Sequence, residues 1–214
     1  DNVESRGLGD VYKRQFSGGT LVEKCCHYFD LINLMAETRI DNVYAVSGQA
    51  VNFIDFTYEG KDSDIHDHAF VVMQFAGGIS ASFTLNMFSR ELYEELRVTG
   101  KNGRLLASEH SSFTPGSRSR AEIMVEVDGH PAYRGKEVTY PAQIEASGHQ
   151  GATFFEHEAF IDQLEGKPHD SASCEQGMWA ILIASAAQQS AAAGQLISVK
   201  DFAAEQGLND VLSW

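Results

Sequence analysis

Residues 68–88 read HAFVVMQFAGGISASFTLNMF. Two runs of strand-forming residues flank Gly77-Gly78, a pair that can supply the positive φ values of a tight hairpin turn. In the second run apolar side chains alternate strictly with polar ones, which are Ser80, Ser82, Thr84 and Asn86. Such alternation is typical of a strand with one apolar and one polar face. The stretch therefore predicts an antiparallel hairpin in a sheet that is covered on one side.

The rest of the chain places more hairpins after this one and helices at both ends. Hairpin signals recur around Lys101-Asn102-Gly103 and around residues 128–131. Helices are predicted at Thr20–Ala36, Thr153–Glu165 and Glu175–Ala193, the last with Ser173 as its N-cap and Gly194 at its end. This order predicts an α+β fold: a large open, predominantly antiparallel sheet with helices packed on one face.

The first fifteen residues, DNVESRGLGDVYKRQ, differ from the rest of the chain because they show neither a helical nor a strand period. We interpret residues 1–15 as a non-native or disordered tail and leave them out of the fold argument. Residues 16–214 are then expected to form one α+β domain. The protein's own N-terminus is expected to lie further upstream.

Charge and composition exclude several classes of partner. The formal net charge is -14, which disfavours nucleic acid and anionic membrane surfaces. No apolar run approaches the roughly 20 residues that span a bilayer. The three cysteines are odd in number and two are adjacent, so they form no disulfide framework. We expect a cytoplasmic location by default. This expectation does not exclude an export signal in the missing upstream part.

The segment 18–31, GGTLVEKCCHYFDL, contains the candidate catalytic residues. On one continuous helix Glu23, His27 and Asp30 would stand at i, i+4 and i+7, within roughly 60° of one another. Carboxylates beside an imidazole can set its tautomer and its pKa, and such a group can transfer protons. The alternative is a histidine satisfied by helix–sheet packing, with Glu23 as an ordinary i,i+4 partner.

Two other histidine-bearing segments are candidate sites. His149 lies in a glycine-flanked loop before a helix, where it would be either a ligand contact or an exposed loop residue. The run Asp64–His68 alternates acids and histidines, which raises the possibility of a metal site. A structural zinc site usually needs four ligands, so we expect no metal and interpret the run as a solvated approach to a strand.

Several segments, taken in order, resemble the Gfo/Idh/MocA family of NAD(P)-dependent oxidoreductases. Residues 18–30 resemble the family's GG…(D/E)xxxHxxD helix, and residues 67–78 its strand–glycine–strand hairpin. Residues 96–103 are similar to a second hairpin, and residues 148–152 to the GHxGxD segment before a helix. Together with the alanine-rich helix and Ile197-Ser198-Val199, the resemblance covers nearly all of 16–214.

The resemblance implies the C-terminal substrate domain of such an enzyme. The family's N-terminal Rossmann domain, which binds NAD or NADP, has no counterpart here, because no GxGxxG follows a predicted strand. The implied reaction passes hydride between NAD(P) and a hydroxyl of a sugar, polyol or related substrate. His27 falls on the catalytic histidine, Glu23 and Asp30 fall on the two acidic positions, and His149 becomes a substrate contact.

The resemblance also sets the expected partners and the alternatives. We expect a small-molecule substrate and a homo-oligomer formed through the open sheet face, and we expect this fragment alone to be inactive. One alternative is an NAD-dependent glycoside hydrolase on the same scaffold, which would release sugar without net NADH. The other is a non-catalytic oligomerisation or binding module, which an upstream Rossmann domain with an intact glycine motif would argue against.

Overall fold

The computed structural model describes residues 17–58, 60–112, 120–131, 133–134, 138–147 and 151–208. The chain divides into two compact units. Unit 1 comprises residues 1–88 and 172–214, and unit 2 comprises residues 89–171. Each unit has its own antiparallel sheet and its own helices, which confirms the predicted α+β class.

Unit 1 is built on a four-stranded sheet with the order β10-β1-β4-β5. Its strands are β1 (Ile40–Gly48), β4 (His68–Phe75), β5 (Ser80–Asn86) and β10 (Ile197–Ser198), and all their pairings are antiparallel. Its helices are α3 (Thr20–Glu23), α4 (Cys26–Ala36), α7 (Cys174–Ala193) and α8 (Val199–Glu205). A short separate hairpin pairs β2 (Thr57–Tyr58) with β3 (Lys61–Asp62).

The hairpin predicted at residues 68–88 is confirmed as β4 and β5. A short 3₁₀ turn, η2 (Ala76–Gly78), joins the strands, and Gly77 and Gly78 have φ values of 78° and 84°. The polar row of β5 is exposed, whereas the apolar row is partly buried against the core. Alternation in the sequence therefore assigned both faces of this strand correctly.

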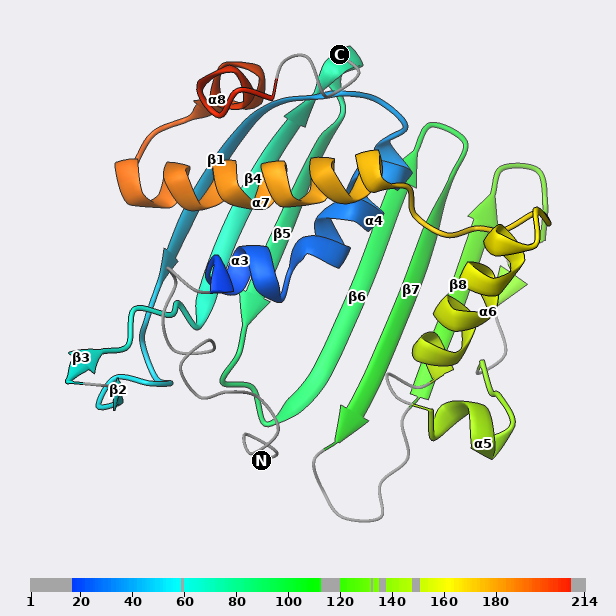
Figure 1. Cartoon of the computed structure of the whole chain (residues 1–214). Coiled ribbons are helices and arrows are strands. Elements are labelled where there is room, and N and C mark those ends of the chain that lie inside the picture. The colour runs from blue at the N-terminus through cyan, green and yellow to red at the C-terminus, as the bar shows by residue number, and fades with distance from the viewer. Residues whose placement is uncertain are drawn as a thin grey trace. The chain divides into compact units, whose positions relative to one another are not determined.

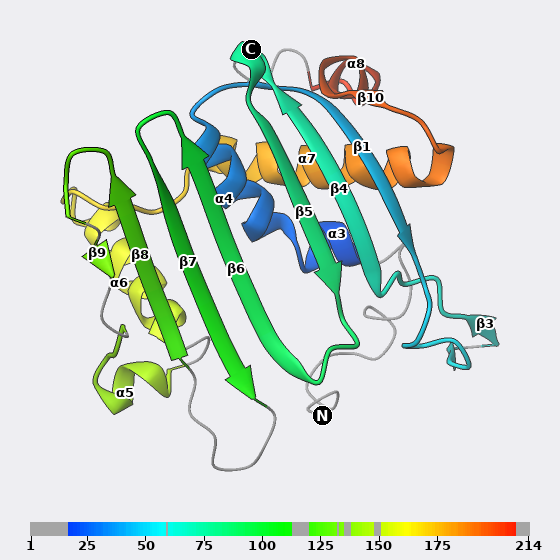
Figure 2. The same cartoon turned by 180° about the vertical axis from the view of Figure 1, so that it is seen from behind.

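The hydrophobic core of unit 1 lies between this sheet and α3, α4 and α7. Figure 1 shows these helices in front of β1, β4 and β5, and Figure 2 shows the other face of the same strands without a helix. Phe29 and Ile183 from the helices meet Val43 and Met73 from the strands, and all four are fully buried. Close packing of this kind gives the strands and helices fixed positions.

The long helix α7 begins and ends as its sequence indicates. The Ser173 hydroxyl accepts a hydrogen bond from the backbone N–H of Gln176, whose side chain in turn accepts from the Ser173 N–H. This is a complete capping box. At the other end Gly194 adopts the left-handed conformation, with φ 65° and ψ 29°. Helix α8, which the sequence patterns do not predict, comes directly after β10.

Unit 2 holds the second four-stranded sheet, with the order β6-β7-β8-β9. Its elements are β6 (Glu91–Gly100), β7 (Gly103–Ser112), β8 (Arg120–Val127), β9 (Tyr133–Arg134), α5 (Ala142–Glu145) and α6 (Ala152–Leu164). The turn predicted at residues 101–103 joins β6 to β7, and the turn predicted at 128–131 lies between β8 and β9. Both views place α6 over one face of this sheet (Figures 1 and 2).

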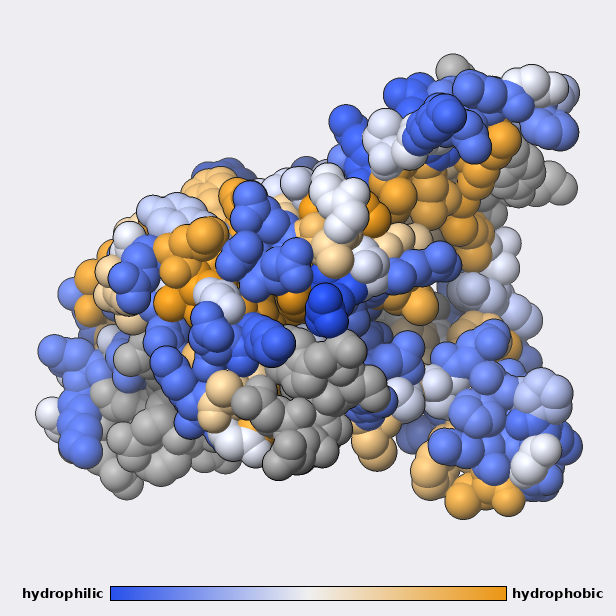
Figure 3. All heavy atoms as spheres, turned by 90° about the horizontal axis from the view of Figure 1, so that it is seen from above, coloured by the Kyte–Doolittle hydropathy of each residue, from blue (hydrophilic) through white to orange (hydrophobic). Residues whose placement is uncertain are grey.

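Hydrophobic side chains also reach the surface. The space-filling view from above shows orange side chains scattered among blue ones (Figure 3). Among the described helices, none is both long enough and apolar enough to cross a membrane.

Candidate functional site

The helix predicted at Thr20–Ala36 is interrupted, so the prediction of one continuous helix was wrong. Helix α3 ends at Glu23, and α4 begins at Cys26 after a turn at Lys24 and Cys25. Cys25 has φ -110° and ψ 0°, and its carbonyl accepts from the N–H groups of both Tyr28 and Phe29. His27 and Asp30 therefore share α4, while Glu23 belongs to the helix before it.

Burial nevertheless separates two stripes along this segment. Leu21, Cys25 and Phe29 are 2%, 0% and 0% exposed and belong to the core. Glu23 and His27 are exposed, although the turn separates them. The buried stripe fixes the helices to the sheet and thereby turns the ionisable side chains outward.

The surroundings of His27 are aromatic and polar. Its ring lies against Tyr28, with the ring centroids 4.0 Å apart, and Tyr28 stacks on Phe83 of β5. Glu23 pairs with Lys24, with 3.2 Å between Oε1 and Nζ. Asp30 is half-buried one turn after His27. An exposed imidazole with carboxylates before and after it in the chain is suited to exchange protons with a bound substrate.

The neighbouring thiol takes no part in such chemistry. Burial raises the pKa of Cys25 to about 12, and the nearby Cys26 and Glu23 add to the effect. The thiol therefore stays protonated at neutral pH and is a poor nucleophile. Cys25 therefore acts as a small buried hydrophobic residue.

The approach to α3 depends on two glycines. Gly18 and Gly19 have φ values of 78° and 85°, and a Cβ at Gly18 would lie 2.8 Å from Cγ1 of Val22. The Ser17 hydroxyl accepts from the Gly19 N–H, and the Gln188 amide of α7 donates to the Gly18 carbonyl. A side chain at Gly18 would be strained as well as crowded.

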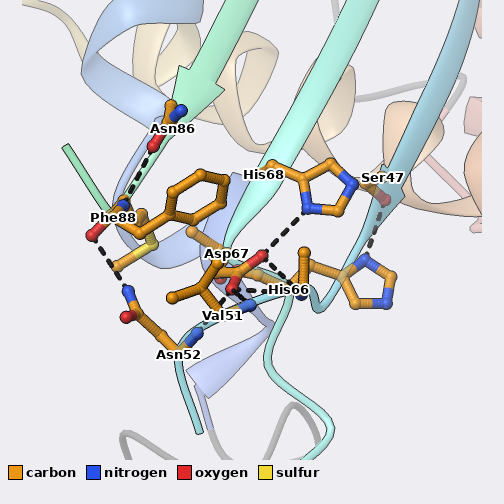
Figure 4. Close-up of polar contacts among 11 residues, drawn as sticks. Ser47, Val51, Asn52, His66, Asp67, His68, Asn86 and Phe88 are labelled. Carbon is orange, nitrogen blue, oxygen red and sulfur yellow. Dashed lines mark hydrogen bonds and ion pairs between the residues drawn. The ribbon is translucent and has the colours of Figure 1, made fainter. Parts of the chain in front are cut away.

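The backbone of His66, which the sequence suggested only as a possible metal ligand, lies against the first residue of α3. The Thr20 hydroxyl donates to the backbone carbonyl of His66 over 2.5 Å. The His66 ring is hydrogen-bonded through Nδ1 to the Ser47 hydroxyl at 2.8 Å (Figure 4). Ser47 is half-buried and follows the buried Val43 and Ala45 on alternate positions of β1, which places it on the helix-covered side of the sheet.

Next to it, Asp67 is a buried carboxylate with several hydrogen-bond donors around it. Its carboxylate is fully buried and accepts from the consecutive backbone N–H groups of Ala50, Val51 and Asn52, over 2.7–3.1 Å. It also pairs with Nδ1 of His68 at 2.9 Å (Figure 4). Burial acts to raise the pKa of Asp67, but the bonds from His68 and the three N–H groups outweigh it and lower the pKa.

Asp67 therefore corrects the interpretation of residues 64–68 as a solvated approach to a strand. Asp64 is exposed, but Asp67 is enclosed and the two histidines are half-buried with separate partners. The His68 ring lies over Gly48, where an added Cβ would come within 3.1 Å of Cε1. The sequence carried only a weak signal of this buried carboxylate, namely an acid directly before a strand. The loop whose N–H groups donate to it lies 15–17 residues earlier in the chain.

Two further predictions concern His149 and a metal site. His149 lies outside the described residues, so its place in the site stays a prediction. Within the described part, no group of three or more His, Cys, Asp or Glu side chains could hold a metal ion.

The residues that the structure describes do not form a dinucleotide site of their own. A nucleotide-binding fold places a glycine turn between a strand and a helix of a parallel sheet. Every strand pairing in the described residues is antiparallel. No step is therefore assigned in which this chain binds the nucleotide.

The fold is α+β, and ionisable side chains of α3 and α4 face outward from it. The sequence model described as the oxidoreductase family, C-terminal alpha/beta domain, matches residues 9–200. The chain belongs to this family, Gfo/Idh/MocA, as the sequence motifs suggested.

Solved structures show the same fold. Levoglucosan dehydrogenase, in complex with NADH and levoglucosan, is 17% identical, with a TM-score of 0.65 over 92% of this chain and 55% of that one. Aldose-aldose oxidoreductase from Caulobacter crescentus, complexed with glycerol, is 13% identical, with a TM-score of 0.57 over 86% of this chain and 49% of that one. The chain thus spans about half the length of these proteins. No curated protein matches it.

Proposed function

We propose that this chain is the substrate-side domain of an oxidoreductase that passes hydride between NAD(P) and a hydroxyl of a sugar, polyol or related compound. The observation that supports this most is the outward stripe of α3 and α4, where His27 is exposed while Cys25 and Phe29 anchor the segment in the core. Membership of an oxidoreductase family supports the reaction class.

In the proposed reaction His27 is the acid/base group. A nicotinamide nucleotide, held outside this chain, would supply the hydride acceptor for oxidation of the substrate carbinol to a carbonyl. The neutral imidazole of His27 takes the hydroxyl proton, so that charge and atoms balance. Glu23 holds the substrate hydroxyl or orients the imidazole, and Asp30 fixes its tautomer.

The substrate class and the cofactor are part of the same proposal. The structural neighbours that carry a sugar derivative, a polyol or NADH in their names favour a polyhydroxylated substrate and a nicotinamide nucleotide. We place the nucleotide mainly on a domain outside this chain, His149 at the substrate, and the protein in the cytoplasm.

The test uses the complete reading frame that carries this chain, purified and supplied with NAD or NADP and a panel of sugars and polyols. The proposal predicts reduced nucleotide in equal amounts to a ketone or lactone product. Sugar release without net reduced nucleotide would instead identify a glycoside hydrolase. No product with any member of the panel would favour a non-catalytic module.

We also propose that the chain forms a homo-oligomer through the open face of β1, β4 and β5. Tyr44, Val46, Phe70 and Val72 are 39–57% exposed there. They are cross-strand neighbours, because Tyr44 pairs with Val72 and Val46 with Phe70. A contiguous apolar patch of this kind is suited to pairing with a second copy about a two-fold axis.

Light scattering can test this assembly. Phe70→Glu places a charge in the patch and should shift the protein to monomer, because a buried unpaired charge is costly. The matched control is Leu164→Glu, at a highly exposed position of α6 in unit 2, which should leave the mass unchanged. A monomeric wild-type protein, or a Phe70→Glu variant that still assembles, would contradict the proposal.

A further inference from the structure

Helix α3 is too short to hold its own position. It has four residues, and its N-cap, Gly19, makes no side-chain capping hydrogen bond. Isolated helices of this length are unstable, because the free-energy cost of nucleation exceeds the stabilisation from a single turn of hydrogen bonds. Contacts with the rest of the fold must therefore fix its direction.

Contacts at and just before its first residues supply this support. Leu21 is buried in the core, and the Gln188 amide holds the carbonyl of Gly18. The Thr20 hydroxyl, itself 4% exposed, donates to the carbonyl of His66. Since Glu23 is only three residues further on, the orientation of its carboxylate depends on this anchorage.

The His66 carbonyl, which accepts from Thr20, is itself held in place by the sheet. The bond between Nδ1 of His66 and the hydroxyl of Ser47 ties residue 66 to β1, on the covered side of the sheet (Figure 4). The next residue, Asp67, fixes the backbone with its own set of bonds to residues 50–52. Ser47, His66 and Thr20 thus connect the rigid strand β1 to the first turn of α3.

We propose that Ser47, His66 and Thr20 act as positioning residues for Glu23 and, through the turn at Lys24 and Cys25, for His27. This inference rests on the proposed oxidoreductase function. Its physical reason is that proton transfer tolerates little misplacement, so that a displacement of about 1 Å can cost on the order of 100-fold in rate. The Thr20 hydroxyl makes the last contact in this series and is the one that can be removed most cleanly.

The test compares Thr20→Val with Thr20→Ser in the complete protein. Valine keeps the shape of threonine but loses the hydroxyl, whereas serine keeps the hydroxyl. The expected result for Thr20→Val is a loss of kcat of about 10- to 100-fold, with the KM for the nucleotide unchanged within about twofold. Thr20→Ser should restore most of the rate. Ser47→Ala should lower kcat in the same direction by a smaller factor.

The matched control is Ser190→Ala. Ser190 is a fully buried hydroxyl on α7 that accepts from the Ala45 N–H and donates to the Gln195 carbonyl. Its loss removes two hydrogen bonds, whereas the loss at Thr20 removes one, and neither partner of the Ser190 hydroxyl lies in α3. Ser190→Ala should therefore lower the melting temperature and leave kcat unchanged.

Two results would overturn the inference: a Thr20→Val enzyme with wild-type kcat, or an equal loss of kcat in Ser190→Ala. Hydrogen exchange of this chain alone separates such a failure from a failure of the proposed function. Thr20→Val should speed amide exchange at residues 20–25 more than Ser190→Ala does, whatever the reaction. A wild-type protein without dehydrogenase activity would refute the function itself, and the catalytic part of the inference with it.

Discussion

Asp67 illustrates how one residue holds the region beside the candidate site. Its carboxylate is fully buried, yet four donors surround it: three consecutive backbone N–H groups and the His68 ring. Its own N–H and carbonyl bond to the Gly48 carbonyl and the Met87 N–H. The residue thus joins the end of β1, the loop after it, the start of β4 and the end of β5.

The lowered pKa of Asp67 predicts a pH-dependent contribution to stability. The folded state binds the proton less tightly than the unfolded chain does, so the ionised carboxylate stabilises the fold. This stabilisation is fully present above the unfolded pKa of about 3.9. It is lost as the pH falls through the lower pKa of the folded state. Asp67→Asn should reduce the free energy of unfolding at pH 7 by about 2–3 kcal/mol. The difference from wild type should shrink below about pH 4.

Urea denaturation at several pH values measures this directly. Asp41→Asn serves as the control, because Asp41 is exposed on β1, and it should change stability by less than about 0.5 kcal/mol. An Asp67→Asn protein as stable as wild type at pH 7 would mean that the buried carboxylate adds nothing to the fold.

At the scale of single residues, the sequence singled out candidate side chains, whose roles stay predictions, but not the contacts that hold the region around them. Glu23, His27 and Asp30 stood out because helical spacing relates positions that are close in the chain. The backbone N–H groups that donate to the Asp67 carboxylate lie 15–17 residues away, and the carbonyl that accepts from the Thr20 hydroxyl lies 46 residues away. Such pairings depend on the tertiary fold, and no local periodicity encodes them.

At the scale of elements, prediction succeeded where the signal was local. The glycines at 77 and 78 and the capping residues of α7 act within a few residues of themselves, and all behave as expected. The first helix is interrupted at Lys24 and Cys25, where the sequence contains no proline or glycine that would indicate a break. Leu21, Cys25 and Phe29 are buried at four-residue spacing on both sides of the interruption, a pattern that a continuous helix would show as well.

The capping box of α7 gives a prediction for this element. Ser173→Ala removes the hydroxyl that accepts from the Gln176 N–H, and it should lower the free energy of unfolding by about 1 kcal/mol. Ser173→Asp keeps an acceptor at the same place and should retain most of the stability. Thermal denaturation followed by circular dichroism compares the three proteins. Equal melting temperatures for wild type and Ser173→Ala would show that the box does not stabilise α7.

At the scale of the whole molecule, each unit carries an antiparallel sheet, and the hydrophobic core identified among the described residues belongs to unit 1. The order of hairpins and helices predicted this α+β class. The division into two units could not be read from the sequence, because the strands of both sheets succeed one another without a compositional break.

The absence of a parallel strand pair in the described residues leads to a prediction about the cofactor. The chain by itself should not bind NAD or NADP tightly, since nothing in its described part has the geometry of a dinucleotide site. Isothermal titration should show dissociation constants weaker than about 1 mM for both nucleotides, against micromolar values for the complete protein. Tight binding by this chain alone would contradict the proposal that a domain outside this chain binds the nucleotide.

The central claim is that His27 exchanges the substrate proton. The most direct measurement is the pre-steady-state rate of nucleotide reduction in the complete protein carrying His27→Asn, compared with His157→Asn at an exposed position of α6. We expect a loss of about 10²- to 10⁴-fold for His27→Asn and a wild-type rate for His157→Asn. A His27→Asn protein that reduces nucleotide within a few-fold of the wild-type rate would contradict it.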